Sequence, residues 1–259
     1  MANDSAKTQA PLPERYEKLR TLWGTEALQR IRDAHVLVLG VGGVGSNCTE
    51  ALARGGVGRL TILDRDVVAE SNINRQAIAF YSTLGQRKVD VMEAMIRDIN
   101  PEAQVTKIFD FLRQEEMREF LDTYARDADY VVDAIDTISA KLKLAELAPR
   151  YSFKLISSMG GANKVRPECF RIADLYDTVN CPLCRIMRKE GRKRGIKELK
   201  VLYSCEQPLQ TDVEAGWERH ERADLGTASF VPPIFGQMIA GEVLRDLAGW
   251  SDRTTPPSR

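Results

Sequence analysis

The chain has 259 residues, 43% of them hydrophobic and 29% charged, and its 37 Lys and Arg residues balance 37 Asp and Glu residues. This ordinary balance predicts a folded globular protein. A net charge of zero gives no indication of a polyanionic partner, and the five cysteines, an odd number, do not favour a disulfide framework.

Neither a signal peptide nor a membrane span is evident. Residues 1–13 are polar and lack the apolar segment of a signal peptide. The apolar stretch 228–240 is interrupted by Pro232, Pro233 and Gln237, and it is shorter than the roughly 20 residues that cross a bilayer. An odd number of cysteines without a secretory signal fits a reducing compartment, so we expect a cytoplasmic protein with no membrane segment.

Strands and helices alternate through the first part of the chain. Short apolar runs predict strands, and apolar stripes with a 3.6-residue period predict helices. In chain order, we expect strands at 35–39, 59–63, 104–109, 130–135 and 154–158, and helices at 46–54, 85–99, 114–121 and 139–147. Such βαβ units predict an α/β fold, with a Rossmann-like, mostly parallel sheet and helices on both of its faces.

The C-terminal half is less regular. A basic segment at 185–200, a strand near 201–203 and a final helix near 234–247 predict an elaborated C-terminal half. We expect a single domain at 14–250, with disordered tails at 1–13 and 251–259, because the tails are polar or Pro-rich and have little to bury.

A glycine-rich loop lies between the first strand and the first helix. Its glycines are Gly40, Gly42, Gly43 and Gly45. Glycines permit a tight turn and a close approach of backbone N–H groups to phosphates, and the helix N-terminus adds partial positive charge. Asp64 ends the second strand, where a carboxylate can accept hydrogen bonds from a ribose. The combination predicts nucleotide binding.

Charged residues beyond Asp64 favour a triphosphate over a dinucleotide. Arg75 lies in a polar run at 71–76, and Lys88 lies in the first turn of the next helix, in line with its buried stripe. Both cations can clamp phosphates and offset charge on leaving pyrophosphate. Asp133 and Asp136 end the fourth strand, where acidic residues suit Mg²⁺ held with phosphates, although Asp136 is equally placed to cap the helix that follows.

Taken together, these residues resemble the ThiF/HesA/MoeB superfamily, which includes ubiquitin-activating enzymes and sulfur-carrier adenylyltransferases. The resemblance extends from about residue 15 to residue 247. Within the superfamily, the chain is similar to the tRNA threonylcarbamoyladenosine dehydratase branch at 22–28, 131–136, 157–160 and 225–233. The resemblance implies ATP- and Mg²⁺-dependent adenylation of a threonyl carboxylate on a modified adenosine beside the tRNA anticodon, followed by ring closure with net loss of water.

The resemblance also implies roles for individual residues. Gly40, Gly42 and Gly45 would cradle the nucleotide, and Asp64 would hold the ribose. The phosphates would be surrounded by Asn72, Arg75, Gln76 and Lys88, and Asp136 would hold Mg²⁺. Members are usually homodimers, so Arg15, or alternatively Arg20, would reach the ATP of a partner subunit, and a sulfur-mobilising protein is a further candidate partner. The branch often has Thr-Asn-Thr-Asn-Arg-Gln where this chain has Ser-Asn-Ile-Asn-Arg-Gln, which retains the Arg and the Gln.

The basic segment at 185–200 holds eight Lys or Arg residues against two Glu residues, an excess of six positive charges. A solvated surface is the plain interpretation, but such a run also suits phosphate contacts. The expected tRNA-binding residues are Arg185, Arg188, Lys189, Arg192, Lys193 and Arg194. We expect Gly191 and Gly195 to interrupt any helix here.

A CxxC pair, Cys181 and Cys184, precedes the basic segment. Structural zinc usually has four ligands, and the other nearby cysteines, Cys169 and Cys205, are isolated, so we expect no zinc. A redox CxxC is also not expected in this fold context. The pair is interpreted as two half-buried thiols at a helix N-terminus.

Three other functions share parts of this pattern. An adenylyltransferase for the C-terminal Gly of a sulfur-carrier or ubiquitin-like protein would share every ATP residue, but it would typically show a second CxxC pair. An NAD-dependent oxidoreductase would use the glycine loop and Asp64 and leave Arg75, Lys88 and Asp136 without a role. A nucleotide-gated RNA-binding module would bind both ligands and form no product.

Overall fold

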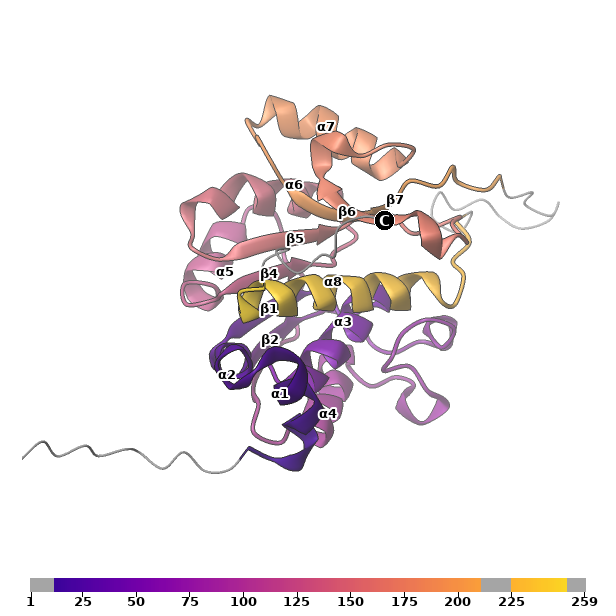
Figure 1. The fold of residues 1–259 in the computed structure, drawn as a ribbon. Coiled ribbons are helices and arrows are strands. Elements are labelled where there is room, and N and C mark those ends of the chain that lie inside the picture. Colours follow the sequence, from indigo (N-terminus) through magenta and orange to yellow (C-terminus); the bar gives the residue numbers. More distant parts are fainter. Residues whose placement is uncertain (1–11, 211–224, 251–259) are drawn as a thin grey trace, which may run out of the picture.

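The computed structural model describes residues 12–210 and 225–250. Its helices are arranged around a single seven-stranded sheet (Figure 1). Of the predicted tails at 1–13 and 251–259, all but residues 12–13 lie outside the described residues. The strands are β1 (His35–Leu39), β2 (Arg59–Leu63), β3 (Gln104–Ile108), β4 (Tyr130–Asp133), β5 (Lys154–Ser158), β6 (Phe170–Asp174) and β7 (Lys200–Ser204). Their order is β3-β2-β1-β4-β5-β7-β6, and all neighbours are parallel except β6 and β7.

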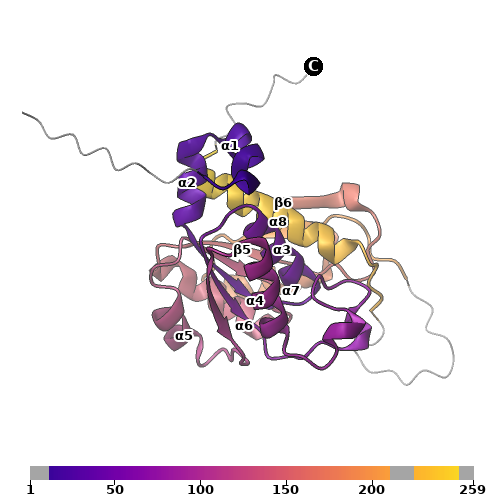
Figure 2. The same ribbon diagram turned by 90° about the horizontal axis from the view of Figure 1, so that it is seen from below.

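Helices cover both faces of the sheet. They are α1 (Glu17–Trp23), α2 (Thr25–Asp33), α3 (Gly43–Arg54), α4 (Lys88–Ile99), α5 (Met117–Tyr124), α6 (Ile138–Leu147), α7 (Pro182–Lys193) and α8 (Val231–Ala248). Apolar side chains of α2, α3, α4 and α8 pack on one face, and those of α5, α6 and α7 pack on the other. Figure 2 shows α8 lying beside α3. The predicted α/β fold with a mostly parallel sheet is therefore confirmed.

Several element boundaries differ from those predicted, and one strand was missed. The helix α3 begins inside the glycine loop, at Gly43, and α4 begins only at Lys88, because Arg87 forms an antiparallel bridge with Val67. The edge strand β6 was not predicted, because its short sequence mixes apolar and charged side chains. Only its first residue, Phe170, is buried. No helix within the described ranges combines the length and apolar character needed to cross a bilayer.

The expectation that Gly191 interrupts the basic segment is wrong. The helix α7 continues through Gly191 to Lys193. Gly191 is buried where the helix approaches Tyr176, whose hydroxyl oxygen would lie 3.2 Å from a Cβ added at this position. A glycine is therefore used here for close packing, and Gly195 follows the end of α7.

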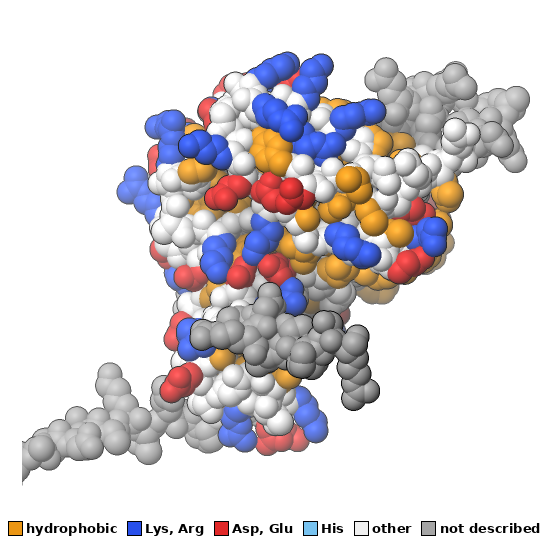
Figure 3. Space-filling model, turned by 45° about the horizontal axis from the view of Figure 1, so that its top comes forward, with side chains coloured by type: hydrophobic (Ala, Val, Ile, Leu, Met, Phe, Trp, Pro, Cys, Tyr) orange, Lys and Arg blue, Asp and Glu red, His pale blue; other side chains and the backbone are white. Residues whose placement is uncertain are grey.

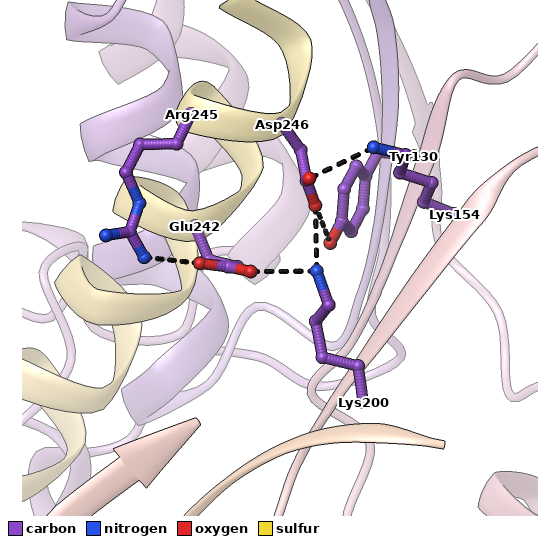
Figure 4. A network of polar contacts seen from close by, with 6 residues as sticks. All are labelled: Tyr130, Lys154, Lys200, Glu242, Arg245 and Asp246. Carbon is purple, nitrogen blue, oxygen red and sulfur yellow. Dashed lines mark hydrogen bonds and ion pairs between the residues drawn. The ribbon is translucent and has the colours of Figure 1, made fainter. Parts of the chain in front are cut away.

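A polar network fastens the C-terminal half of α8 to the starts of three strands (Figure 4). Lys200 Nζ on β7 lies 2.8 Å from Glu242 and 2.9 Å from Asp246. Asp246 also accepts hydrogen bonds from the Tyr130 hydroxyl at 2.9 Å and from Lys154 Nζ at 3.0 Å. The network therefore lies at the edge of the sheet where the strands begin. It stabilises the fold there, at the opposite edge from the loops that follow the carboxyl ends of the strands.

Asp246→Asn is expected to lower the free energy of unfolding at pH 7 by about 2–3 kcal/mol, the scale of hydrogen bonds to a charged group. Burial raises the pKa of Asp246, but hydrogen bonds from Lys200, Lys154 and Tyr130 outweigh it and lower this pKa below its ordinary value of 3.8. A lowered native pKa stabilises the fold above the unfolded-state pKa, and this stabilisation is lost as pH falls through the native pKa.

The difference between wild type and Asp246→Asn in urea unfolding should therefore be largest at neutral pH and shrink below about pH 4. Asp98→Asn, at an exposed position on α4, serves as the control. A difference that stays constant with pH would contradict this interpretation of the network.

Candidate functional site

A pocket of about 490 Å³ lies at the carboxyl ends of the central strands. It opens between β1 and β4, where the strand order reverses, which is the usual ligand position in open α/β sheets. Residues predicted to bind a nucleotide line it together: Gly40, Gly42, Gly43, Asp64, Asn72, Arg75, Gln76, Lys88 and Asp136. Three loops and a helix start that are distant in sequence thus converge on one cavity.

The glycine loop divides into packing positions and lining positions. Gly40 has a φ of +91°, and a Cβ there would lie 2.7 Å from the carbonyl oxygen of Ala134. A Cβ on Gly45 would lie 1.7 Å from the Gly40 carbonyl oxygen, so Gly45 serves close packing and is not among the lining residues. Gly42 and Gly43 line the pocket at the N-terminus of α3, where backbone N–H groups without helical partners can bind an anion.

Asp64 is held rigidly at the edge of the pocket. Its side chain is nearly buried, and its two carboxylate oxygens accept hydrogen bonds from Val41 N at 2.7 Å and Asp66 N at 2.8 Å. These backbone bonds fix the orientation of the carboxylate, which remains part of the pocket lining. A fixed acceptor of this kind suits the hydroxyl groups of a ribose.

The two predicted cations reach the pocket from different elements. Lys88 is the first residue of α4; its side chain is 6% exposed and its Nζ lies 2.9 Å from Asp66, which sequence analysis did not single out. The guanidinium of Arg75 donates hydrogen bonds to the Ser71 carbonyl at 2.9 Å and to the side chain of Asn74 at 2.7 Å. Both cations are thereby oriented before any ligand binds, which lowers the reorganisation needed around phosphates.

Gln76 provides an unsatisfied polar atom at the pocket. The residue is 8% exposed, and within the described chain its Oε1 has no hydrogen-bond partner. Buried polar atoms are rarely left unpaired. The site therefore has room for a polar ligand group beside Gln76.

The two acidic residues predicted after β4 have different surroundings. Asp136 is exposed on the pocket rim and accepts a hydrogen bond from Thr137 Oγ1 at 3.3 Å; Thr137, not Asp136, is the N-cap residue of α6. Asp133 is 1% exposed, forms an ion pair with Lys141 at 3.0 Å and accepts a hydrogen bond from Ser157 Oγ at 2.5 Å. Asp133 is thus engaged below the pocket, and only Asp136 lines it.

Lys141 is a pocket residue that sequence analysis missed. It is 2% exposed and its Nζ also lies 2.9 Å from the Ser158 carbonyl oxygen. The signal was a lysine between two apolar residues, Ala140 and Leu142, in a helix next to the pocket. Such a position predicts a buried cation that needs an acidic partner.

A magnesium ion would find oxygen ligands here. The described residues contain no group of three or more His, Cys, Asp or Glu side chains arranged around a metal ion. Mg²⁺ bound together with substrate phosphates usually takes only one or two carboxylates from the protein. Asp136, exposed on the same pocket as Arg75 and Lys88, fits that arrangement.

The basic residues of α7 lie on the part of the molecule that forms the top of Figure 1, and Figure 3 shows many Lys and Arg side chains there. Arg185, Lys189, Arg192, Lys193 and Arg194 are exposed. Arg188 is half-buried and donates a hydrogen bond to the Thr178 carbonyl oxygen at 2.8 Å, so it anchors the helix. The start of α7 contributes Leu183 to the pocket lining.

Arg15 and the CxxC pair lie outside the pocket lining. Arg15 forms an ion pair with Glu102 at 3.0 Å, and its role toward a partner subunit stays a prediction. Cys181 is the N-cap residue of α7 and, at 4% exposed, is buried, as is Cys184 at 0%. The expected helix N-terminus is correct, but the thiols are fully and not half buried.

Fold and pocket together define a Rossmann-like protein of the nucleotide-binding class. The model of the ThiF family matches residues 16–258, and the chain belongs to this family. It is 42% identical to the tRNA threonylcarbamoyladenosine dehydratase of Bacillus subtilis over 86% of this chain and 91% of that protein.

A solved structure and a more distant relative complete the comparison. The chain is similar to the structure of the Escherichia coli tRNA N6-threonylcarbamoyladenosine dehydratase in complex with ATP, with a TM-score of 0.80, 30% identity and coverage of 93% of this chain and 96% of that chain. The molybdopterin-synthase adenylyltransferase of Salmonella typhimurium is 35% identical over only 46% of each chain.

Proposed function

We propose that this protein is an ATP-dependent tRNA threonylcarbamoyladenosine dehydratase. The observation that carries the proposal is that dehydratases match nearly the whole chain, whereas a carrier-protein adenylyltransferase matches less than half of it. The pocket supports the same conclusion, because Arg75, Lys88 and Asp136 would have no role with NAD. The dehydratase function therefore accounts for both the pocket and the C-terminal half.

The proposed reaction has two steps in one pocket. The threonyl carboxylate attacks the α-phosphorus of ATP, pyrophosphate leaves, and an acyl-adenylate forms. A nucleophile within the same side group then attacks the acyl carbon and displaces AMP, closing a ring. The substrate loses the elements of water, and its oxygen departs on AMP. No protein nucleophile is needed, so the protein acts through positioning and charge stabilisation.

The lining residues divide this work between them. Asp64 holds the ribose, and the N-terminus of α3 with Arg75 and Lys88 offsets charge on the phosphates. Asn72 and Gln76 orient the same phosphates through their amides. Asp136 would hold Mg²⁺, which would neutralise charge on the phosphates and on leaving pyrophosphate.

Partners follow from surfaces outside the pocket. The exposed basic residues of α7 bind tRNA phosphates while the modified adenosine occupies the pocket. A homodimer would allow Arg15 to act on the partner's nucleotide, and a sulfur-mobilising protein is a further candidate partner. A tRNA-modifying role places the protein in the cytoplasm.

Reversing charge on α7 is expected to weaken tRNA binding selectively. Arg185→Glu combined with Lys189→Glu should raise the Kd for tRNA at least about tenfold at physiological salt and lower the salt dependence by about two counterions. ATP affinity should not change, because neither residue lines the pocket. The matched control is Arg118→Glu with Arg126→Glu, which reverses two exposed charges in and just beyond α5. Equal tRNA affinity for both double variants would refute the proposed α7 interface.

Substrate-dependent release of pyrophosphate tests the proposed function against its main alternative. The protein would be given ATP, Mg²⁺ and either tRNA carrying threonylcarbamoyladenosine or a carrier protein that ends in Gly-Gly. Release with the tRNA alone supports the dehydratase. Release with the carrier alone would replace it with a carrier-protein adenylyltransferase.

A further inference from the structure

A pair of buried thiols lies beneath the pocket wall, and the mechanism above does not use it. Cys181 is the N-cap residue of the 12-residue helix α7, and its Sγ accepts a hydrogen bond from Cys184 N at 3.4 Å. Both cysteines therefore lie at the start of α7, at the CxxC spacing that a disulfide can bridge.

A buried lysine accompanies the two thiols. Lys164 is 2% exposed, and its Nζ donates hydrogen bonds to the carbonyl oxygens of Asn180, at 3.4 Å, and of Glu206. The carbonyl of Asn180 belongs to the residue that precedes Cys181. A cation buried at this point favours the thiolate form of Cys181, which is the reactive form of cysteine.

Acid–base properties of the pair agree with this geometry. The hydrogen bond from the Cys184 thiol, opposed by burial and assisted by backbone N–H groups and Lys164, lowers the pKa of Cys181 to about 6. The same hydrogen bond to Cys181, together with burial, raises the pKa of Cys184. One sulfur is thus a thiolate near neutral pH, and its neighbour keeps a proton.

The thiolate is coupled to the pocket through the backbone. Gly160 lines the pocket, and its backbone N–H is among the groups that lower the pKa of Cys181. Leu183, between the two cysteines, lines the same pocket. A change at the Cys181 sulfur therefore reaches two lining residues directly.

We propose that Cys181 and Cys184 form a reversible redox site that responds to hydroperoxides. The Cys181 thiolate attacks one oxygen of hydrogen peroxide, which forms a sulfenic acid and releases hydroxide. The Cys184 thiol then attacks that sulfur, forming the disulfide and releasing water. Overall, two thiols lose two electrons and two protons, and one peroxide becomes two water molecules.

Oxidation would loosen the nucleotide pocket. The disulfide removes the negative charge that Lys164 and the Gly160 N–H stabilise. The lining at Gly160 and Leu183 then loses its fixed position, and ATP affinity should fall about tenfold, the scale of one charge-assisted hydrogen bond. This consequence rests on the proposed nucleotide function of the pocket.

The test treats the full-length protein with hydrogen peroxide and locates disulfides by peptide mass spectrometry under non-reducing conditions. ATP affinity is measured before oxidation, after oxidation and after dithiothreitol. The expected result is a Cys181–Cys184 bond, about tenfold weaker ATP binding and full recovery on reduction. A control protein carries Cys169→Ser and Cys205→Ser, which removes the two half-exposed cysteines directly before β6 and directly after β7. Its ATP affinity should respond to oxidation and reduction in the same way as that of the wild type.

Two further variants keep the outcome decisive. Cys184→Ser cannot form the disulfide and should accumulate a Cys181 sulfenic acid that a 1,3-diketone probe traps. Lys164→Met should slow oxidation of Cys181. A bond between Cys169 and Cys205 in place of Cys181–Cys184, or no bond at all, would overturn the redox site. Failure of ATP to bind the reduced protein would instead overturn the proposed function.

Discussion

Lys88→Met is expected to reduce ATP-dependent adenylate formation by about 10²- to 10³-fold in kcat/KM, the scale of one preorganised charge at a reacting group. Lys88 is nearly buried at the start of α4 and lines the pocket, so its charge acts on phosphates through a medium with little water. Methionine keeps the apolar stem and removes only the ammonium. The measurement is tRNA-dependent exchange of labelled pyrophosphate into ATP.

A matched lysine outside the pocket provides the control. Lys107 on β3 is paired with Asp90 and Glu93 and is exposed, so Lys107→Met should leave exchange unchanged. Because Lys88 is paired with Asp66, the thermal stability of Lys88→Met is measured alongside. Wild-type exchange by a folded Lys88→Met protein would remove Lys88 from the proposed mechanism.

Lys141→Met is expected to lower the free energy of unfolding by about 3–5 kcal/mol, because it leaves the buried Asp133 carboxylate without its countercharge. The two side chains are 1% and 2% exposed, and their atoms lie 3.0 Å apart. Urea unfolding at neutral pH measures the loss. The same substitution should weaken ATP binding, since Lys141 lines the floor of the pocket.

The double variant Lys141→Met with Asp133→Asn separates loss of the pair from loss of an isolated charge. Neutralising Asp133 removes the buried charge, so the double variant should be more stable than Lys141→Met alone. Equal or lower stability of the double variant would show that the cost of Lys141→Met comes from lost packing.

Much of the sheet could be predicted because its central strands β1, β2 and β4 are buried on both faces and read as short apolar runs. The limits of β1, β2 and β5 agree with the prediction. Boundaries set by tertiary contacts could not be predicted. The continuation of α7 through Gly191 depends on the neighbouring Tyr176, and the edge strand β6 depends on pairing with β7.

The pocket residues were predictable where a motif carried its own chemistry, as in the glycine loop, Asp64 and the Arg75 segment. The individual role of each pocket residue could not be predicted, because it depends on which side chains contact one another in the fold. Gly45 packs against Gly40 and lies behind the lining, and Asp133 is engaged by Lys141 below it. Sequence spacing does not specify that Lys141, eight positions after Asp133, would be its buried partner.

The dehydratase proposal is tested most directly by nucleoside mass spectrometry. A tRNA carrying the open threonylcarbamoyl group would be incubated with the protein and Mg²⁺, with or without ATP, and digested to nucleosides. We expect the modified nucleoside to lose the mass of one water only when ATP is present. An unchanged mass, with ATP bound normally, would contradict this expectation and move the adenylated carboxylate to a carrier-protein C-terminus.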